Sequence, residues 1–237
     1  MKRIWIVMAM VLVVCSANLA SAAVYNMYES FTNSDGTLTW GADPSLLVPT
    51  SSDFTAPLTW SATFNTIGLH YFGVFVDPEI DELLNTYYNE KGSAQGTLAA
   101  GQSWQIGDPV ADNTVSPNIY DLASRGTLTN SDLNGGIAND VALALGWNFN
   151  LGANQTATLS FTLSDILPTS GFFLHQYDPG ISPEGVQVSD PASLYFYSTL
   201  LIEDTGGNTP VPEPSTIVLL GTALAGLGLY ARKRKNV

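Results

Sequence analysis

The sequence contains very little cysteine and histidine. Cys15 is its only cysteine, and His70 and His175 are its only histidines, in a chain of 237 residues. A single thiol excludes an intramolecular disulfide and every metal site that needs several cysteines. No H-E-x-x-H zinc motif, G-x-S-x-G nucleophile elbow or phosphate-binding loop is present. The sequence therefore predicts no catalytic site and favours a protein that is not an enzyme.

Basic residues are also scarce, and most lie at the two ends of the chain. Residues 23–210 contain only Lys91 and Arg125 against twenty acidic residues, which leaves this part with a net charge of −18. Such a charge excludes nucleic acid as a partner, because phosphate binding needs a basic surface. The acidic groups have few salt-bridge partners, so they must be solvated or must hold cations.

The N-terminal residues 1–22 have the three parts of a signal peptide. Lys2 and Arg3 are followed by an apolar run over residues 4–14, and Ala20 and Ala22 form an A-x-A cleavage site. Eleven apolar residues are too few to span a membrane, for which roughly 17 are needed. We expect export, with cleavage after Ala22 that also removes the only cysteine.

The C-terminal residues also have three parts. A short Pro-Glu-Pro segment, Pro212, Glu213 and Pro214, precedes an uncharged apolar segment over residues 216–231. Four basic residues follow directly: Arg232, Lys233, Arg234 and Lys235. The apolar segment predicts a transmembrane helix, and a basic cluster beside such a helix stays on the cytoplasmic side.

This ending resembles the PEP-CTERM sorting signal of Gram-negative bacteria, over residues 212–235. The resemblance implies processing by an exosortase, passage through the export machinery and transient anchoring in the inner membrane. It also implies a final place at the cell surface or in an exopolysaccharide matrix, where many such proteins support biofilm formation. A plain C-terminal membrane anchor is the alternative.

Between these ends, the sequence predicts one all-β domain over residues 23–203, followed by a linker over residues 204–211. Residues 58–64 alternate between apolar and polar side chains, which is typical of a half-buried strand. Asn65 and Thr66 then predict a tight turn to a second strand over residues 67–76, as an antiparallel hairpin. Further strands are expected at residues 37–40, 103–106, 140–150, 156–164, 171–176 and 193–202. Short strands separated by turn residues favour an antiparallel β-sandwich.

One short helix is predicted near residues 78–90. Asp77 suits the N-cap, Pro78 suits the first helical position, and apolar residues recur at helical spacing after them. Asp77, Glu79, Asp81 and Glu82 form the densest acidic group of the chain. A solvated helix N-terminus is the expected role of this group, and cation binding is the alternative.

A second candidate cation site lies at residues 130–135. Asn130, Asp132 and Asn134 alternate before a glycine, as in the first half of a calcium-binding loop. The twelfth loop position, which should be a bidentate acid, is Val141, with Asp140 beside it. Ca²⁺ is therefore the one metal that this segment suggests, and an ordinary Asn/Asp/Gly turn is the alternative.

The five tryptophans raise the question of carbohydrate binding. Aromatic residues on alternating strands usually belong to the core, but Trp104 lies in a polar stretch and is the best candidate for stacking on a sugar. The sequence thus favours an exported structural or adhesive protein, with a carbohydrate-binding module as the alternative. A glycan-active enzyme with a pair of carboxylates is the third and weakest hypothesis.

Overall fold

The computed structural model describes residues 24–40, 52–80, 89–109, 117–133, 140–182, 184–188 and 191–206. This part of the chain forms two β-sheets and one short helix. The predicted signal peptide and the sorting signal lie outside the described residues, as does the expected transmembrane helix over residues 216–231. Among the described residues, no helix has the length and apolar character needed to cross a membrane.

The first sheet has seven strands. They are β1 (Val24–Ser34), β2 (Thr37–Trp40), β3 (Ser52–Thr55), β5 (Gly68–Glu79), β7 (Gln102–Gly107), β8 (Ser131–Asp132) and β9 (Ala142–Leu151). Their order is β2-β1-β5-β9-β7-β8, and β3 pairs with the start of β1. All pairs are antiparallel except the short pair β7 and β8. Strand β5 is therefore central, with β1 on one side and β9 on the other.

The second sheet has five strands. They are β4 (Leu58–Phe64), β6 (Lys91–Gln95), β10 (Gln155–Ser164), β11 (Phe173–Asp178) and β12 (Ala192–Asp204). Their order is β4-β10-β12-β11-β6, and all pairs are antiparallel. Strand β12 lies in the middle of this sheet, between β10 and β11.

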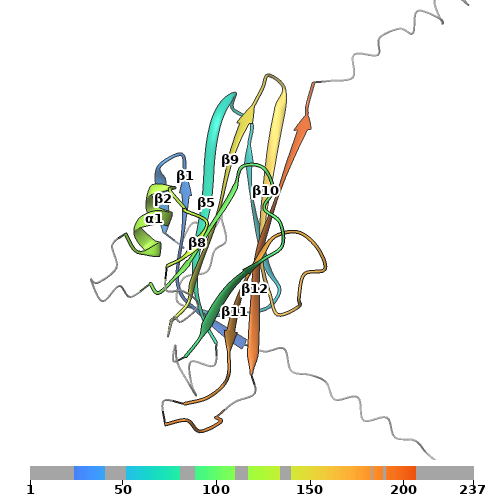
Figure 1. Cartoon of the computed structure of the whole chain (residues 1–237). Coiled ribbons are helices and arrows are strands. Elements are labelled where there is room, and N and C mark those ends of the chain that lie inside the picture. Colours follow the sequence, from blue (N-terminus) through green and yellow to red (C-terminus); the bar gives the residue numbers. More distant parts are fainter. Residues whose placement is uncertain are drawn as a thin grey trace, which may run out of the picture.

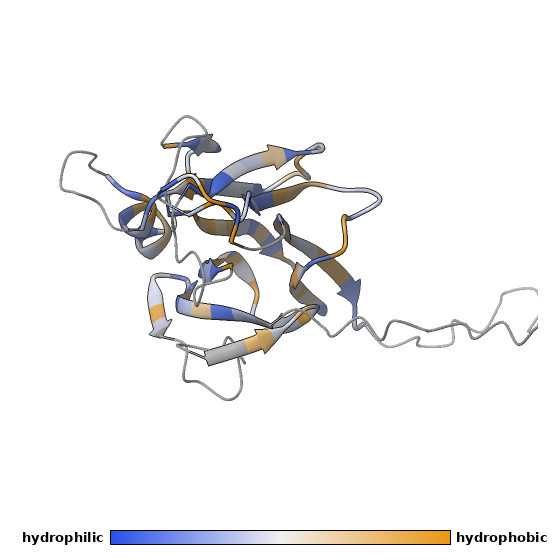
Figure 2. Cartoon of the chain, turned by 90° about the horizontal axis from the view of Figure 1, so that it is seen from below, coloured by the Kyte–Doolittle hydropathy of each residue, from blue (hydrophilic) through white to orange (hydrophobic). Residues whose placement is uncertain are grey.

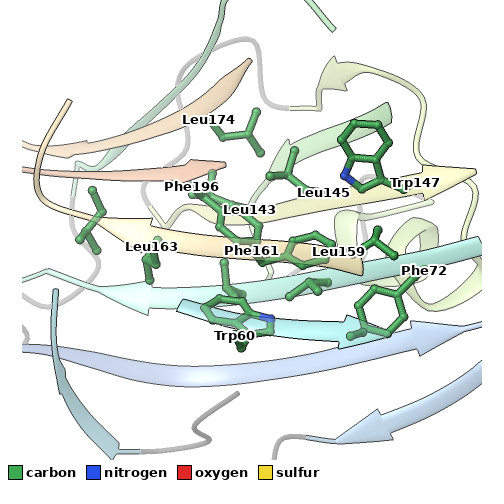
Figure 3. Close-up of a cluster of buried hydrophobic side chains, with 14 of the residues drawn as sticks. Trp60, Phe72, Leu143, Leu145, Trp147, Leu159, Phe161, Leu163, Leu174 and Phe196 are labelled. Carbon is green, nitrogen blue, oxygen red and sulfur yellow. The ribbon is translucent and has the colours of Figure 1, made fainter. Parts of the chain in front are cut away.

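The two sheets face each other across the larger hydrophobic core, as in a β-sandwich (Figure 3). Trp60 and Phe161 of the second sheet and Phe72 of the first lie in it, and their rings are in contact. Burying a side chain of this size contributes about 1.5–3 kcal/mol. The alternation of apolar and polar residues that builds this layer can be followed along the strands in Figure 2. The expected all-β fold is confirmed.

Helix α1 (Ile119–Arg125) lies beside the first sheet, on the side away from the second sheet (Figure 1). It covers a second, smaller core on the outer face of the first sheet. Ile119 packs there against Phe31 and Phe75, over the small side chains Ala142 and Ala144. Asn118 caps the helix N-terminus, and its Oδ1 accepts a hydrogen bond from the amide of Asp121 at 2.8 Å. This helix was not predicted from the sequence, because its seven residues are too few to show a clear helical repeat of apolar side chains.

The predicted hairpin between residues 58–64 and 67–76 is wrong. Strand β4 pairs with β10 in the second sheet, whereas β5 pairs with β1 and β9 in the first. The physical reason lies in the two side-chain patterns. Strand β4 has one polar face, and Thr59 meets Thr162 of β10 there with hydroxyl oxygens 3.0 Å apart. Strand β5 is apolar on both faces and needs cover on both, which the second sheet and α1 provide.

The helix predicted near residues 78–90 is wrong at its start. Asp77, Pro78 and Glu79 belong to strand β5, and Asp77 and Glu79 are buried instead of forming a solvated helix N-terminus. Pairing with β1 extends the strand this far, because Met27 lies opposite Pro78 and Asn26 opposite Glu79. Residues 81–88 lie outside the described residues. Strand β1 itself was not predicted, because its polar residues resemble those of a loop.

The ring of Tyr71 lies in a slot formed by glycines. Gly73 of β5 and Gly146 of β9 are paired across the sheet, and a Cβ atom at either position would meet the Tyr71 hydroxyl. At Gly146 the separation would be 2.6 Å, which is too short for real contacts. The hydroxyl is buried and has no hydrogen-bond partner among the described residues, and burial raises the pKa of Tyr71. The two strands thus leave room for one ring.

We expect Gly146→Ala to lower the free energy of unfolding by about 1–3 kcal/mol, because the new methyl group must displace the ring of Tyr71. Tyr71→Phe should be neutral or slightly stabilising alone, since it removes an unsatisfied hydroxyl. It should also recover part of the Gly146→Ala loss. Urea unfolding of both variants and of the double variant measures this coupling, and Gly206→Ala is the control at a position with room for a Cβ atom. If the changes in the free energy of unfolding of Gly146→Ala and Tyr71→Phe were strictly additive, the contact between Tyr71 and position 146 would be contradicted.

Candidate functional site

Three acidic side chains meet on the outer face of the first sheet. Asp77 and Glu79 come from the end of β5, and Asp140 lies just before β9. One carboxylate oxygen from each residue lies within 4.8 Å of those from the other two. The exposed fractions are 1 %, 5 % and 6 %, respectively, so all three groups are buried. We call this group the acidic triad.

The β register brings the triad together. Asp77 and Glu79 are two residues apart on one strand, so their side chains share a face. Val76 pairs with Leu143, and the same antiparallel register continued by three residues brings Glu79 opposite Asp140. On the other side of β5, Glu29 of β1 pairs directly with Asp77. Three chain segments therefore deliver carboxylates to one end of the sheet.

The carboxylates of Asp77 and Asp140 lack neighbouring groups that would neutralise their charge in the described part of the chain. The Oδ1 atoms of Asp77 and Asp140 are buried and accept no hydrogen bond from the described residues. Burial raises the pKa of Asp77 well above its usual range, and the charges of Asp140 and Glu79 raise it further. Burial, with a contribution from Asp108, raises the pKa of Asp140 to about 7. Within the described ranges, no basic group offsets these effects for either aspartate.

The two basic residues of the described chain lie elsewhere. Arg125 forms an ion pair with Asp121 on helix α1, with 3.4 Å between Nη2 and Oδ1. Lys91 is on β6, which belongs to the other sheet. Neither histidine joins the triad, since His70 pairs with Asp35 and His175 with Ser193. The arrangement offers only hard oxygen donors, which suit a cation such as Ca²⁺ or Mg²⁺.

A fourth buried acid, Glu90, shows what a satisfied carboxylate looks like in this protein. Its Oε2 accepts hydrogen bonds from the amide of Val141 at 3.2 Å and from Nε2 of Gln176 at 2.6 Å. The same Nε2 also donates to the carbonyl oxygen of Pro78 at 2.6 Å. Burial raises the pKa of Glu90 well above its usual range, while the bond from Gln176 lowers it. Glu90 thus has a structural role that joins the ends of the two sheets.

Of the predicted calcium segment at residues 130–135, the described residues 130–133 support the backbone of β7. The Oδ1 of Asn130 accepts a hydrogen bond from the amide of Trp104 at 2.9 Å, and Asp132 lies on β8 opposite Ile106. Asn134 lies outside the described residues. Ca²⁺ binding at Asn130, Asp132 and Asn134 stays a prediction. The acidic triad shares no residue with this segment.

Trp104, the candidate for sugar stacking, lies on β7 and is half-buried. Its ring packs beside the main core, with 6.0 Å between its centroid and that of Phe172. Trp60 and Trp147 are buried core residues, as expected for alternating aromatics, and Nε1 of Trp147 donates to Oγ of Ser198 at 2.9 Å. Carbohydrate binding by Trp104 stays a prediction.

Sequence reasoning singled out Asp77 and Glu79 but assigned them to the wrong setting, and it did not connect them with Asp140. A usable signal was present. Two acids flank Pro78 directly after a run of apolar residues at 72–76, and no basic residue follows nearby. Acidic residues that directly follow the apolar residues of a buried strand are expected to be buried with that strand. Only the register of β9 identifies the third member.

A separate shallow hollow of about 490 Å³ lies beside His70. Nδ1 of His70 donates to Oδ2 of Asp35 at 2.9 Å, and Nε2 donates to the carbonyl oxygen of Thr66 at 2.8 Å. Carboxylate and carbonyl oxygens only accept, so the doubly protonated ring satisfies both. These bonds raise the pKa of His70, with that from Asp35 contributing most. Burial instead lowers the pKa of His175.

We expect His70 to titrate above the usual value of about 6.5 and His175 below it. The stability that the His70–Asp35 pair contributes is complete below that value and is lost as the pH rises through the raised pKa. Asp35→Asn, which keeps a residue tolerant of the left-handed turn conformation, should lower the pKa of His70 and leave that of His175 unchanged. NMR titration of the two imidazoles measures this, and a His70 pKa at or below about 6.5 would contradict the pairing.

Comparison with known families finds a match at one end of the chain. Residues 210–235 match the family model of the PEP-CTERM protein-sorting motif. The match covers Pro212, Glu213 and Pro214, the apolar segment 216–231 and the basic residues 232–235, so the predicted sorting signal is confirmed. It supports an exported protein that is sorted by an exosortase. No curated protein matches the chain, and no solved structure matches it. Cleavage of the signal peptide after Ala22, at the site formed by Ala20 and Ala22, stays a prediction.

Proposed function

We propose that this chain is a structural or adhesive protein of the cell surface or exopolysaccharide matrix. The observation that carries the proposal is the sorting motif at residues 210–235, which assigns the chain to exosortase-dependent export. The motif determines how the protein is exported, and it does not define what the β domain does. The role at the destination is therefore argued from the properties of the β domain.

The domain suits a passive role outside the cell. Its twenty acidic and two basic residues within 23–210 favour solubility and weak self-association. The strands are paired in two sheets around a core of large apolar side chains, and burial of this apolar surface stabilises the domain. These features support a scaffold more than a receptor for a small molecule.

We also propose that the protein is not an enzyme. In the described part of the chain, His175 has the Ser193 hydroxyl as its hydrogen-bond partner, and His70 lies between Asp35 and Thr66. Nε2 of His70 is 3.2 Å from the Thr66 hydroxyl but donates to the Thr66 carbonyl oxygen, so the protonated ring is not placed to take a proton from that hydroxyl. The acidic triad contains no candidate nucleophile besides its own carboxylates. Glycoside hydrolysis needs two carboxyl groups about 5–9.5 Å apart on opposite sides of an accessible bond. Carboxylates that are buried within 4.8 Å of one another do not provide that arrangement.

The first prediction of the proposal concerns processing. Protein recovered from the envelope or matrix of its native host should end near residues 211–215, because the exosortase acts close to the Pro-Glu-Pro motif. Changing Pro212, Glu213 and Pro214 to alanine should leave the C-terminal segment attached. Intact-mass spectrometry distinguishes the two forms. A wild-type protein that retains residues 216–237 would reduce the sorting signal to a plain anchor.

The second prediction separates the structural role from carbohydrate binding. A structural protein should show no saturable binding to neutral glycans, and loss of residues 212–235 should weaken matrix integrity. A carbohydrate-binding module should instead be retained on glycans in a saturable way that Trp104→Ala abolishes. Glycan-column retention and matrix shear tests measure these outcomes. Saturable retention that depends on Trp104 would overturn the structural proposal in favour of the binding module.

A further inference from the structure

The acidic triad brings buried carboxylates together without a cation that would compensate the charge of its two aspartates in the described part of the chain. Three carboxylates share one buried end of the first sheet, and the described chain supplies no positive group to Asp77 or Asp140. Several kcal/mol are needed to bury each uncompensated charge, so proteins pair such groups or use them to bind metals. A cluster of acids on a protein surface would need no such explanation, since water would solvate it.

The second observation is independent of the clustering. Asp77 is only 1 % exposed, and its carboxylate faces the other two while its Oδ1 accepts no hydrogen bond from the described residues. The Oδ1 of Asp140 is in the same state. The neighbouring Glu90 accepts bonds from Val141 and Gln176, so donors are available in this part of the fold. They are not directed at these two aspartate oxygens.

We propose that Asp77, Glu79 and Asp140 form a binding site for one calcium ion, which joins the end of β5 to the start of β9. The three carboxylates would be direct ligands. Glu29 of β1 pairs with Asp77 of β5, so it lies beside the triad and is suited to complete the coordination. The site goes beyond the proposed function and does not depend on it, because it rests on the β domain alone.

The surroundings of the triad favour calcium over magnesium. The triad oxygens lie within 4.8 Å of one another, which is close enough for one ion to contact all three, since two oxygens on opposite sides of a calcium ion are about 4.6–5.2 Å apart. Magnesium binds at about 2.0–2.1 Å, dehydrates reluctantly and rarely occupies a site built only from protein groups. A buried site lined by carboxylates is the kind that calcium fills.

The position of the ion explains what it would do. Strand β5 is the central strand of its sheet, and the triad lies where β5 ends and the chain leaves the sheet. An ion shared by Asp77 and Glu79 on β5 and by Asp140 would hold the strand end to its neighbour. Extracellular calcium modules bind with dissociation constants of about 10⁻⁴–10⁻³ M. Such a site would stabilise the domain after export to a medium that contains calcium.

Calcium titration of the full chain, stripped of metal with EGTA, tests the site. Isothermal titration calorimetry should show one calcium ion per chain, and about 10 mM calcium should raise Tm by about 5–10 °C. Asp77→Asn and Asp140→Asn should each weaken binding at least about tenfold, because each removes one charged ligand. The conservative change Asp165→Asn, at an exposed aspartate, should leave affinity unchanged.

The Tm of the variants without metal shows whether weaker calcium binding results from a lost ligand or from misfolding. Without calcium, Asp77→Asn and Asp140→Asn should have a Tm equal to or above that of the wild type, because each removes a buried repulsive charge. Wild-type protein that shows neither heat of binding nor a Tm shift at that calcium concentration would overturn the proposal. So would variants with unchanged affinity, and tighter binding of magnesium than of calcium would overturn the choice of ion. None of these results would affect the sorting of the chain, which mass spectrometry tests separately.

Discussion

A carboxylate loses its hydration when it is buried, and the protein must replace what water supplied. This constraint applies to Asp77 and Asp140, which lie together with Glu79 at the end of β5 and whose Oδ1 atoms accept no hydrogen bond from the described residues. The composition restricts the remedy, because residues 23–210 contain only two basic side chains and both lie elsewhere. A proton or a bound cation is what remains. The choice between them decides how stable the junction of β1, β5 and β9 is outside the cell.

The rest of the fold follows from how apolar surface is distributed over the strands. Strand β5 is apolar on both faces, so it lies in the middle of the first sheet, between the second sheet and helix α1. The outer residues of β9 are small, which lets the helix and the ring of Tyr71 approach the sheet. Strands β4 and β10, which each have one polar face, lie in the second sheet, whose outer surface is polar along these two strands. The acidic triad lies at the end of the doubly covered strand, and that position accounts for its burial.

Local patterns in the sequence predicted much of this, and the limits of the prediction are physical. Residues 58–64 alternate cleanly, and the predicted strand has the same bounds as β4. Alternation says nothing about the partner, however, so the assumption that neighbouring strands pair gave a hairpin that does not exist. Asp77 and Pro78 suit a helix start locally, but pairing with β1 outweighs that preference and extends β5. The third ligand, Asp140, is 63 positions from Asp77 in the chain and is brought there only by the register of β9.

The sorting signal was identifiable without a structure because order and spacing within a short segment define it. The central claim about the domain is instead three-dimensional: a cation neutralises the acidic triad. Anomalous diffraction from crystals grown in calcium tests this claim most directly. We predict a peak bonded to oxygens of Asp77, Glu79 and Asp140 at about 2.3–2.6 Å. The claim would be contradicted by the absence of a peak together with carboxyl oxygens paired directly at about 2.5–2.7 Å, the separation of oxygens that share a proton.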